Sequence, residues 1–295
     1  MKYAVKSILV FVMTLFFVSA HAKTHMHVEP GSYEVSAKRW KNAANSATFD
    51  SDSWVWSLGF SDKYHKNGKR DTALIVPSTA VPDDVTLVIW FHGLGGFTES
   101  GFQRRIMSQL NELAKDSHSF ALAIPEMPWS VNTTTPRGRQ GRVWTKPGEL
   151  ERYVAGVRLR LEKWSMLRHN RPLGTVRIVF VGHSAGGSAL MAAAKEGSLC
   201  RIGPEAIIWS DASYGYWLDA TMNSCVKRLD TQLHILVRKW DKPHKSAERA
   251  LKLYKRKPGL YVPHIRYQVL DRRAWSHRRI GDNALELTGV FPPGC

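Results

Sequence analysis

The feature that most constrains the fold of this chain is a glycine-rich hexapeptide, GHSAGG, at residues 182–187. Residues 176–181 before it form an apolar run typical of a buried strand, and residues 188–195 after it have the composition of a helix. A strand that passes into a helix through Gly-x-Ser-x-Gly turns so tightly that the serine, here Ser184, holds its hydroxyl alone above a sheet. The flanking glycines avoid a Cβ clash between the closely approaching strand and helix. The alternative interpretation is a glycine-rich turn with an incidental serine.

The length and composition of the chain favour one large domain. Its 295 residues are 43% hydrophobic and 23% charged, which is enough for a sizeable core. Predicted strands lie at residues 54–60, 72–77, 86–91, 120–125, 176–181, 206–210, 233–237 and 265–270, and predicted helices at residues 102–115, 149–164, 188–195 and 246–254. Strands that alternate with helices predict an α/β fold with a mostly parallel central sheet and helices on both faces. We expect residues 23–295 to form this single domain.

The first 22 residues have the pattern of a secretory signal peptide. Lys2 and Lys6 give a basic start, residues 8–18 are almost wholly apolar, and Ala20 and Ala22 form a small-x-small cleavage site. The apolar run is shorter than the roughly 20 residues that a membrane span needs. We therefore expect a secreted or periplasmic protein without a membrane span after cleavage, with an uncleaved anchor as the alternative.

The net charge of +17 is large, and loss of Lys2 and Lys6 with the signal peptide leaves +15. Such an excess could attract an anionic polymer of the cell envelope, such as lipopolysaccharide, an acidic glycan or teichoic acid. A soluble basic surface without a partner is equally consistent with it. The sequence has no basic–aromatic repeat and no zinc-finger spacing, so it gives no specific signal for nucleic acid.

The three cysteines predict a disulfide in an exported protein. Cys200 and Cys225 flank one predicted strand and its following loop, which favours that pair, and Cys295 is then left over. Three pairings are possible, and the sequence leaves them open. No Cys-x-x-Cys motif is present, and no metal ligand set or cofactor is expected.

A serine hydroxyl is a weak nucleophile, so chemistry at Ser184 needs hydrogen-bond donors for a developing oxyanion, together with a base and an acid. The segment HGLGG at residues 92–96 follows a predicted strand and is similar to an HG-x-G oxyanion loop. The predicted donors are the amide of Ala185 and the amide of Leu94 or Gly93. Dinucleotide binding by the same glycines is disfavoured because Gly-x-Gly-x-x-Gly is absent.

The predicted base is His277, which lies seven residues beyond the last predicted strand, in an expected loop. His244, which follows an earlier strand, is a weaker candidate. The acid is open between Asp211 and Asp241, because each directly follows a predicted strand and could deliver a carboxylate to the carboxyl edge of the sheet. Asp211 lies among small and aromatic residues, whereas lysines flank Asp241.

With these motifs, nearly all of the chain after residue 22 resembles the α/β-hydrolase superfamily. That resemblance implies a serine hydrolase, and the usual position of the acid in the superfamily would favour Asp241. The GHSAGG turn and the stretch DASYG at residues 211–215 are more similar to an exported bacterial subgroup, which implies Asp211 as the acid. The fold hosts many chemistries, so the resemblance says little about the substrate.

The sequence therefore predicts an exported hydrolase that cleaves an ester or amide through an acyl-enzyme on Ser184. The expected substrate is a small molecule or an acylated component of the cell envelope. Residues 126–148, a long polar connection, are a candidate for substrate contact or a solvated basic loop. The alternative function is a catalytically inactive, hydrolase-like envelope protein that binds an anionic polymer or glycan.

Overall fold

The computed structural model describes residues 23–29, 47–58, 71–93, 100–126, 140–224, 231–255 and 264–291. The predicted signal peptide lies outside these residues, so its assignment stays a prediction. Among the helices that are described, none combines the length and the apolar character needed to cross a membrane.

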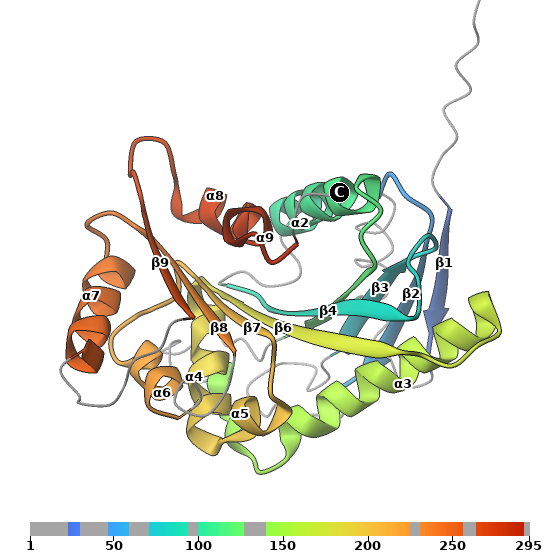
Figure 1. The fold of residues 1–295 in the computed structure, drawn as a ribbon, viewed down its shortest axis with the longest axis horizontal. Helices are drawn as coiled ribbons and strands as arrows, with labels where there is room; N and C mark the ends of the chain where they lie inside the picture. The colour runs from blue at the N-terminus through green and yellow to red at the C-terminus, as the bar shows by residue number, and fades with distance from the viewer. Residues whose placement is uncertain are drawn as a thin grey trace, which may run out of the picture.

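A nine-stranded sheet forms the centre of the molecule (Figure 1), with the spatial order β1-β2-β3-β5-β4-β6-β7-β8-β9. The strands are β1 Thr24–Val28, β2 Ser51–Ser57, β3 Asp71–Pro77, β4 Asp84–Phe91, β5 Phe120–Pro125, β6 Thr175–His183, β7 Ala206–Ser210, β8 Gln232–Arg238 and β9 Ile265–Leu270. In this spatial order, the six strands β5, β4, β6, β7, β8 and β9 are each parallel to their neighbours within this group. Strand β3 is antiparallel to both β2 and β5. The prediction of a mostly parallel sheet is confirmed.

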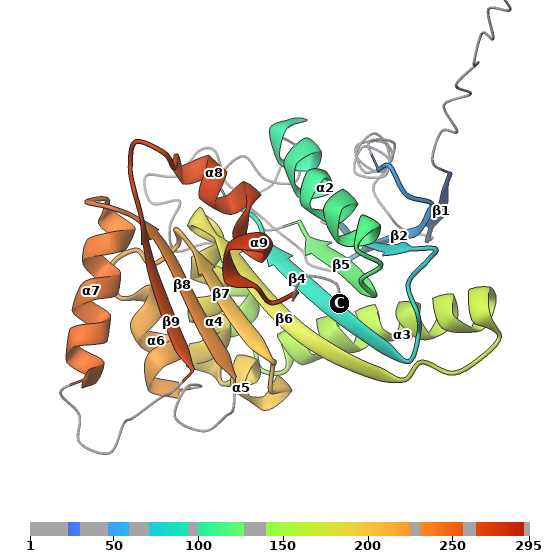
Figure 2. The same cartoon turned by 45° about the horizontal axis from the view of Figure 1, so that its top comes forward.

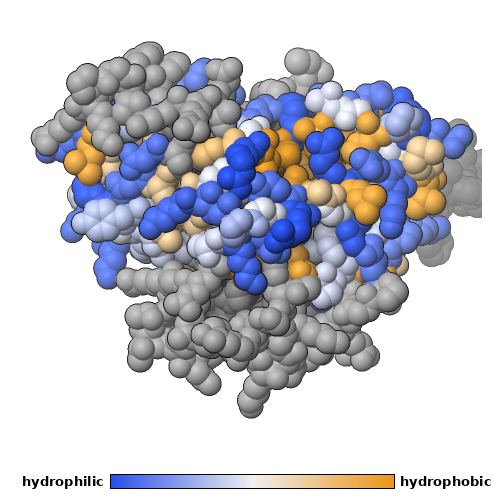
Figure 3. Space-filling model, turned by 90° about the horizontal axis from the view of Figure 1, so that it is seen from below, coloured by the Kyte–Doolittle hydropathy of each residue, from blue (hydrophilic) through white to orange (hydrophobic). Residues whose placement is uncertain are grey.

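Helices cover both faces of this sheet, as Figure 2 shows. They are α2 Ser100–Lys115, α3 Glu149–His169, α4 Gly187–Glu196, α5 Ser198–Ile202, α6 Trp217–Ser224, α7 Lys242–Lys255, α8 His277–Asp282 and α9 Ala284–Thr288, with 3₁₀ helices η3 Gln140–Thr145 and η4 Ser184–Gly186. Helices α2, α8 and α9 pack on one face, and α3, α4, α6 and α7 on the other. Figure 3 views the molecule from the side of α3, where hydrophilic residues predominate and hydrophobic ones form smaller groups.

The central strands are buried on both faces, which explains their continuous apolar sequences. In β4, Leu87, Ile89 and Phe91 point into the core beneath α3 and α4. Val88 and Trp90 alternate with them and point into the core beneath α2 and α8. One strand thus contributes to two hydrophobic cores, and its carboxyl end is held firmly between them.

The structure contains elements that the sequence patterns did not predict. Residues 24–28, which were not predicted as a strand, form β1, which pairs in parallel with β2. The short helices α5, α6, α8 and α9 were also missed, because five to eight residues show too little periodicity. Helix α3 continues to His169, five residues beyond the prediction, and ends where Asn170 adopts a left-handed conformation with φ of 50°.

One residue near the end of the long connection at residues 126–148 belongs to the core. Trp144 in η3 is fully buried, with its ring 5.5 Å from that of Phe91 and 5.6 Å from that of Tyr153. An indole packed in this way is a structural anchor, so the expectation of a solvated or substrate-contacting loop is wrong for Trp144, whereas residues 145–147 are exposed and their contact with substrate stays a prediction. Residues 127–139 lie outside the described residues, and their contact with substrate stays a prediction.

Candidate active site

The register of three parallel strands brings their carboxyl ends to one edge of the sheet. Phe91 of β4 lies opposite Gly182 of β6, and His183 of β6 lies opposite Ser210 of β7. The residues that follow these strands are therefore neighbours at this edge. Ligands bind at such an edge in open α/β sheets, because the connecting loops leave it accessible.

The turn after β6 holds Ser184 in an unusual conformation. Its φ is 53°, in the left-handed region that costs a residue with a side chain about 1–3 kcal/mol. The turn also depends on Gly186, where a Cβ would lie 2.0 Å from the carbonyl oxygen of Phe91. Ser184 is 6% exposed, so the serine lies at the tip of a strained, closely packed turn.

The predicted oxyanion residues are only partly described. A Cβ on Gly93 would lie 3.0 Å from the Cβ of Ser184, so the chain after β4 passes directly beside the serine. Ala185 follows the serine in η4. His92 is buried, with its Nδ1 2.9 Å from the carbonyl oxygen of Gly93. Leu94 lies outside the described residues, and its role as a donor stays a prediction.

The structure joins Asp211 to His277. Asp211 directly follows β7 and is fully buried, and its Oδ2 lies 2.6 Å from Nδ1 of His277. Its Oδ1 accepts a hydrogen bond of 3.2 Å from the backbone N–H of Arg238. A carboxylate only accepts hydrogen bonds, so Nδ1 of His277 carries the hydrogen of this bond. In the neutral imidazole, Nε2 is then free to accept a proton.

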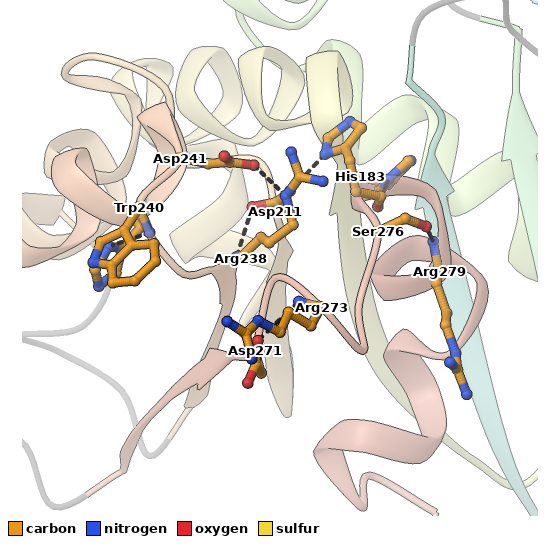
Figure 4. A network of polar contacts seen from close by, with 11 residues as sticks. His183, Asp211, Arg238, Trp240, Asp241, Asp271, Arg273, Ser276 and Arg279 are labelled. Carbon is orange, nitrogen blue, oxygen red and sulfur yellow. Dashed lines mark hydrogen bonds and ion pairs between the residues drawn. The ribbon is translucent and has the colours of Figure 1, made fainter.

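The alternative acid, Asp241, has a different partner. It accepts a hydrogen bond from Nε of Arg238, and Figure 4 shows Arg238 between Asp211 and Asp241. His244, the weaker candidate for the base, accepts a 3.0 Å hydrogen bond at Nδ1 from the backbone N–H of Trp240. The geometry therefore pairs Asp211 rather than Asp241 with His277.

His277 begins α8, so the expectation that it lies in a loop is wrong. Ser276 caps this helix, because its hydroxyl accepts a 3.0 Å hydrogen bond from the backbone N–H of Arg279. A serine that can cap a helix is a sequence signal for a helix start, so Ser276 could have indicated α8. A helix of six residues is, however, too short to show a recognisable apolar pattern.

The sequence analysis assigned no role to His183, which the structure brings against His277. The two rings stack with centroids 4.9 Å apart, and Nε2 of His183 lies 3.2 Å from the backbone oxygen of His277. The pKa of His183 is lowered to about 3, mainly by burial and also by the nearby His277 and His92, while the hydrogen bond to the His277 carbonyl opposes this shift. His183 is therefore neutral at pH 7, and as the donor it carries its hydrogen on Nε2.

The remaining sequence predictions concern metals and cysteines. Within the described part of the chain, no cluster of three or more histidine, cysteine, aspartate or glutamate side chains could hold a metal ion. Cys225 and Cys295 lie outside the described residues, so the pairing of Cys200 with Cys225 stays a prediction.

Comparison with known proteins gives structural neighbours only. No protein-family model matches the chain, and no curated protein sequence matches it. Among solved structures, a protein named FAE has a TM-score of 0.51 and 10% sequence identity, over 80% of this chain and 86% of that chain. A cold-adapted esterase from an Arctic intertidal metagenomic library has a TM-score of 0.49 and 10% identity, over 80% and 94% of the two chains. An IroE-like serine hydrolase from Shewanella oneidensis has a TM-score of 0.44 and 13% identity, over 79% and 78%.

At these identities, structural likeness informs on the fold alone. The mostly parallel sheet of nine strands with helices on both faces is an α/β architecture. The chain therefore has the α/β-hydrolase fold.

Proposed function

We propose that this protein is a serine hydrolase that cleaves an ester or an amide. In this proposal Ser184 is the nucleophile, His277 the general base and Asp211 the acid that orients His277. The observation that carries the proposal is the 2.6 Å bond between the buried carboxylate of Asp211 and His277, at the same sheet edge as Ser184. A buried carboxylate that fixes one imidazole nitrogen leaves the other free to act on a serine.

The proposed reaction has two halves. The Ser184 oxygen attacks the acyl carbon while Nε2 of His277 takes the hydroxyl proton, and the substrate oxygen becomes an oxyanion that accepts from the amides of Ala185 and of Leu94 or Gly93. The oxyanion then collapses, the bond to the leaving group breaks, and His277 protonates that group. A water molecule then gives a proton to His277 and attacks the acyl carbon, the bond between this carbon and the Ser184 oxygen breaks, and His277 returns the proton to that oxygen as the acid product leaves.

Basic residues around this edge favour a substrate with negative charge. Arginines 272, 273, 278 and 279 are exposed beside His277, and Lys239 is exposed at the end of β8. The backbone N–H of Lys239 bonds the oxygen of Leu270 at 2.9 Å, so these two segments adjoin. Cations near a reaction site attract anionic substrates. We propose an anionic or envelope-bound acyl compound as substrate, and export directed by residues 1–22.

Labelling with a fluorophosphonate probe tests the proposed nucleophile. The purified protein should be labelled on Ser184, and Ser184→Ala should abolish labelling while its melting temperature stays within a few degrees of the parent protein. Ser210→Ala is a matched control, because Ser210 is buried at the same edge and its hydroxyl has no hydrogen-bond partner among the described residues. It should be labelled at the parent rate. A folded Ser184→Ala protein that is labelled normally would disprove the assignment.

A second candidate function is a hydrolase-like protein that binds an anionic polymer without catalysis. The net charge of +17 and the arginines beside His277 favour it. Its signature is retention on immobilised polyanion that falls steeply with salt and is unchanged by Ser184→Ala, together with absence of probe labelling on the native protein.

A further inference from the structure

We propose that His183 and Gly281 together form a seat for α8 that sets the position of the His277 imidazole. This inference rests on the proposed function, because it assigns His183 as a positioning residue for the proposed base. We call the ring of His183 and the backbone of Gly281 the α8 seat.

The first part of the α8 seat is the double contact between His183 and His277. The ring of His183 stacks on the ring of His277 at 4.9 Å with an interplanar angle of 29°, and its Nε2–H donates to the backbone oxygen of the same residue at 3.2 Å. One contact acts on the side chain and the other on the main chain. With the bond from Nδ1 of His277 to Asp211, two contacts hold the imidazole itself and a third holds the main chain that carries it.

The second part of the seat is the close approach of Gly281. A Cβ on Gly281 would lie 2.6 Å from both Cδ2 and Nε2 of the His183 ring. Glycine inside a helix costs about 1 kcal/mol relative to alanine, so its use at this position needs a packing reason. That reason is the His183 ring, which α8 could not approach so closely if residue 281 carried a side chain.

Other contacts hold α8 without help from the seat. Ile280 is fully buried in the core beneath α2, and the side-chain oxygen of Gln109 accepts a 3.1 Å hydrogen bond from the backbone N–H of Leu285 in α9. Loss of the His183 contacts should therefore leave α8 folded and attached to α2. What changes is the fine position of its first residue, His277.

The chemistry of His183 suits this role. His277 becomes positively charged when it takes the serine proton, and a second cation stacked on it would oppose that step. Burial lowers the pKa of His183 to about 3, so the seat stays neutral while it donates its hydrogen bond. A permanently charged lysine or arginine in the same position would lack this property.

Four variants test the α8 seat. His183→Gln keeps a side-chain amide N–H that can donate to the His277 oxygen, whereas His183→Leu has similar size without a donor. Gly281→Ala adds the Cβ that pushes α8 away and leaves His183 itself unchanged. Gly156→Ala is the control, because Gly156 lies within α3, and a Cβ there would meet only a guanidinium nitrogen of Arg160 at 3.5 Å, an ordinary van der Waals distance.

The readouts are the kcat and KM for a neutral aryl ester, the fluorophosphonate labelling rate and the melting temperature. A displacement of about 1 Å can cost about 10²-fold in rate, so we expect His183→Leu and Gly281→Ala to lower kcat by about 30- to 100-fold with little change in KM. His183→Gln should stay within about fivefold of the parent protein, and Gly156→Ala should match it. The inference is overturned if His183→Leu and Gly281→Ala are folded and keep the parent kcat, or if Gln and Leu at position 183 lose activity equally.

A proton NMR measurement separates this inference from the proposed function. The hydrogen between Nδ1 of His277 and Asp211 should give a far-downfield resonance in the parent protein, and Asp211→Asn should remove it. We expect Gly281→Ala to shift or broaden this resonance and Gly156→Ala to leave it unchanged, whether or not the protein turns over any ester. An unaltered resonance in Gly281→Ala would overturn the seat, whereas absence of labelling in the parent protein would overturn only the proposed function.

Discussion

Replacement of Asp211 by asparagine is the sharpest test of the proposed site, because the structure fixes what the substitution removes. Two N–H groups donate to this buried carboxylate, one from Nδ1 of His277 at 2.6 Å and one from the backbone of Arg238 at 3.2 Å. An asparagine of the same shape offers only one oxygen and places an NH₂ group at the other position. One of the two donors must lose its acceptor, or His277 must move its hydrogen to Nε2, where it can no longer take a proton from serine.

The expected decreases in kcat and in stability follow from these lost hydrogen bonds. An asparagine in the equivalent role of a Ser-His-Asp triad lowers kcat by about 10⁴, and we expect Asp211→Asn to lower it by about 10³ to 10⁴. This factor corresponds to about 4–5.5 kcal/mol in transition-state free energy. The orphaned buried donor should also cost about 1–3 kcal/mol in stability.

The matched control is Asp241→Asn. Asp241 pairs with Arg238 three residues away, and its side chain is 19% exposed. We expect kcat to stay within about threefold of the parent value and stability to change by less than about 1 kcal/mol. The assay is ester hydrolysis under saturating substrate, with urea unfolding of each variant. The reasoning is refuted if Asp211→Asn keeps more than a tenth of the activity, or if Asp241→Asn loses as much as Asp211→Asn.

Two further predictions concern stability. Gly186→Ala should destabilise the fold by at least about 3 kcal/mol in urea unfolding, because its Cβ would lie 2.0 Å from the backbone oxygen of Phe91, and an unchanged midpoint would contradict the close packing of the turn. Stability should also fall as the pH drops from 6.5 towards 4, because burial lowers the pKa of His183 to about 3 and that of His234 to about 4, so the unfolded chain takes up protons that the folded chain does not. His183→Gln should reduce this loss by about 1–2 kcal/mol at pH 5, and a pH dependence identical to that of the parent protein would show that His183 is not buried in its neutral form.

Most strands and the longer helices could be predicted from the sequence, because the patterns that indicate them lie within short segments of the chain. Continuous apolar runs such as residues 176–181 and 206–210 become central strands, since a strand buried on both faces has no polar side. Elements with little periodicity were missed, among them β1 and the six-residue helix α8. Their formation depends on edges and faces that exist only after the sheet has assembled.

The sequence alone predicted that a serine would stand in a sharp strand-to-helix turn, because glycines at positions 182, 186 and 187 allow the strand and the helix to approach where a Cβ would clash. It could not choose between Asp211 and Asp241, since both follow parallel strands that end at the same edge. The tertiary structure pairs Asp241 with the side chain of Arg238 and the buried Asp211 with His277, and this contact supports Asp211 as the acid in the proposed function. The contact between His183 and α8 could also be found only in the tertiary structure. The alternation of side chains along a strand tells which face of the sheet a residue is on, but not which helix covers that face.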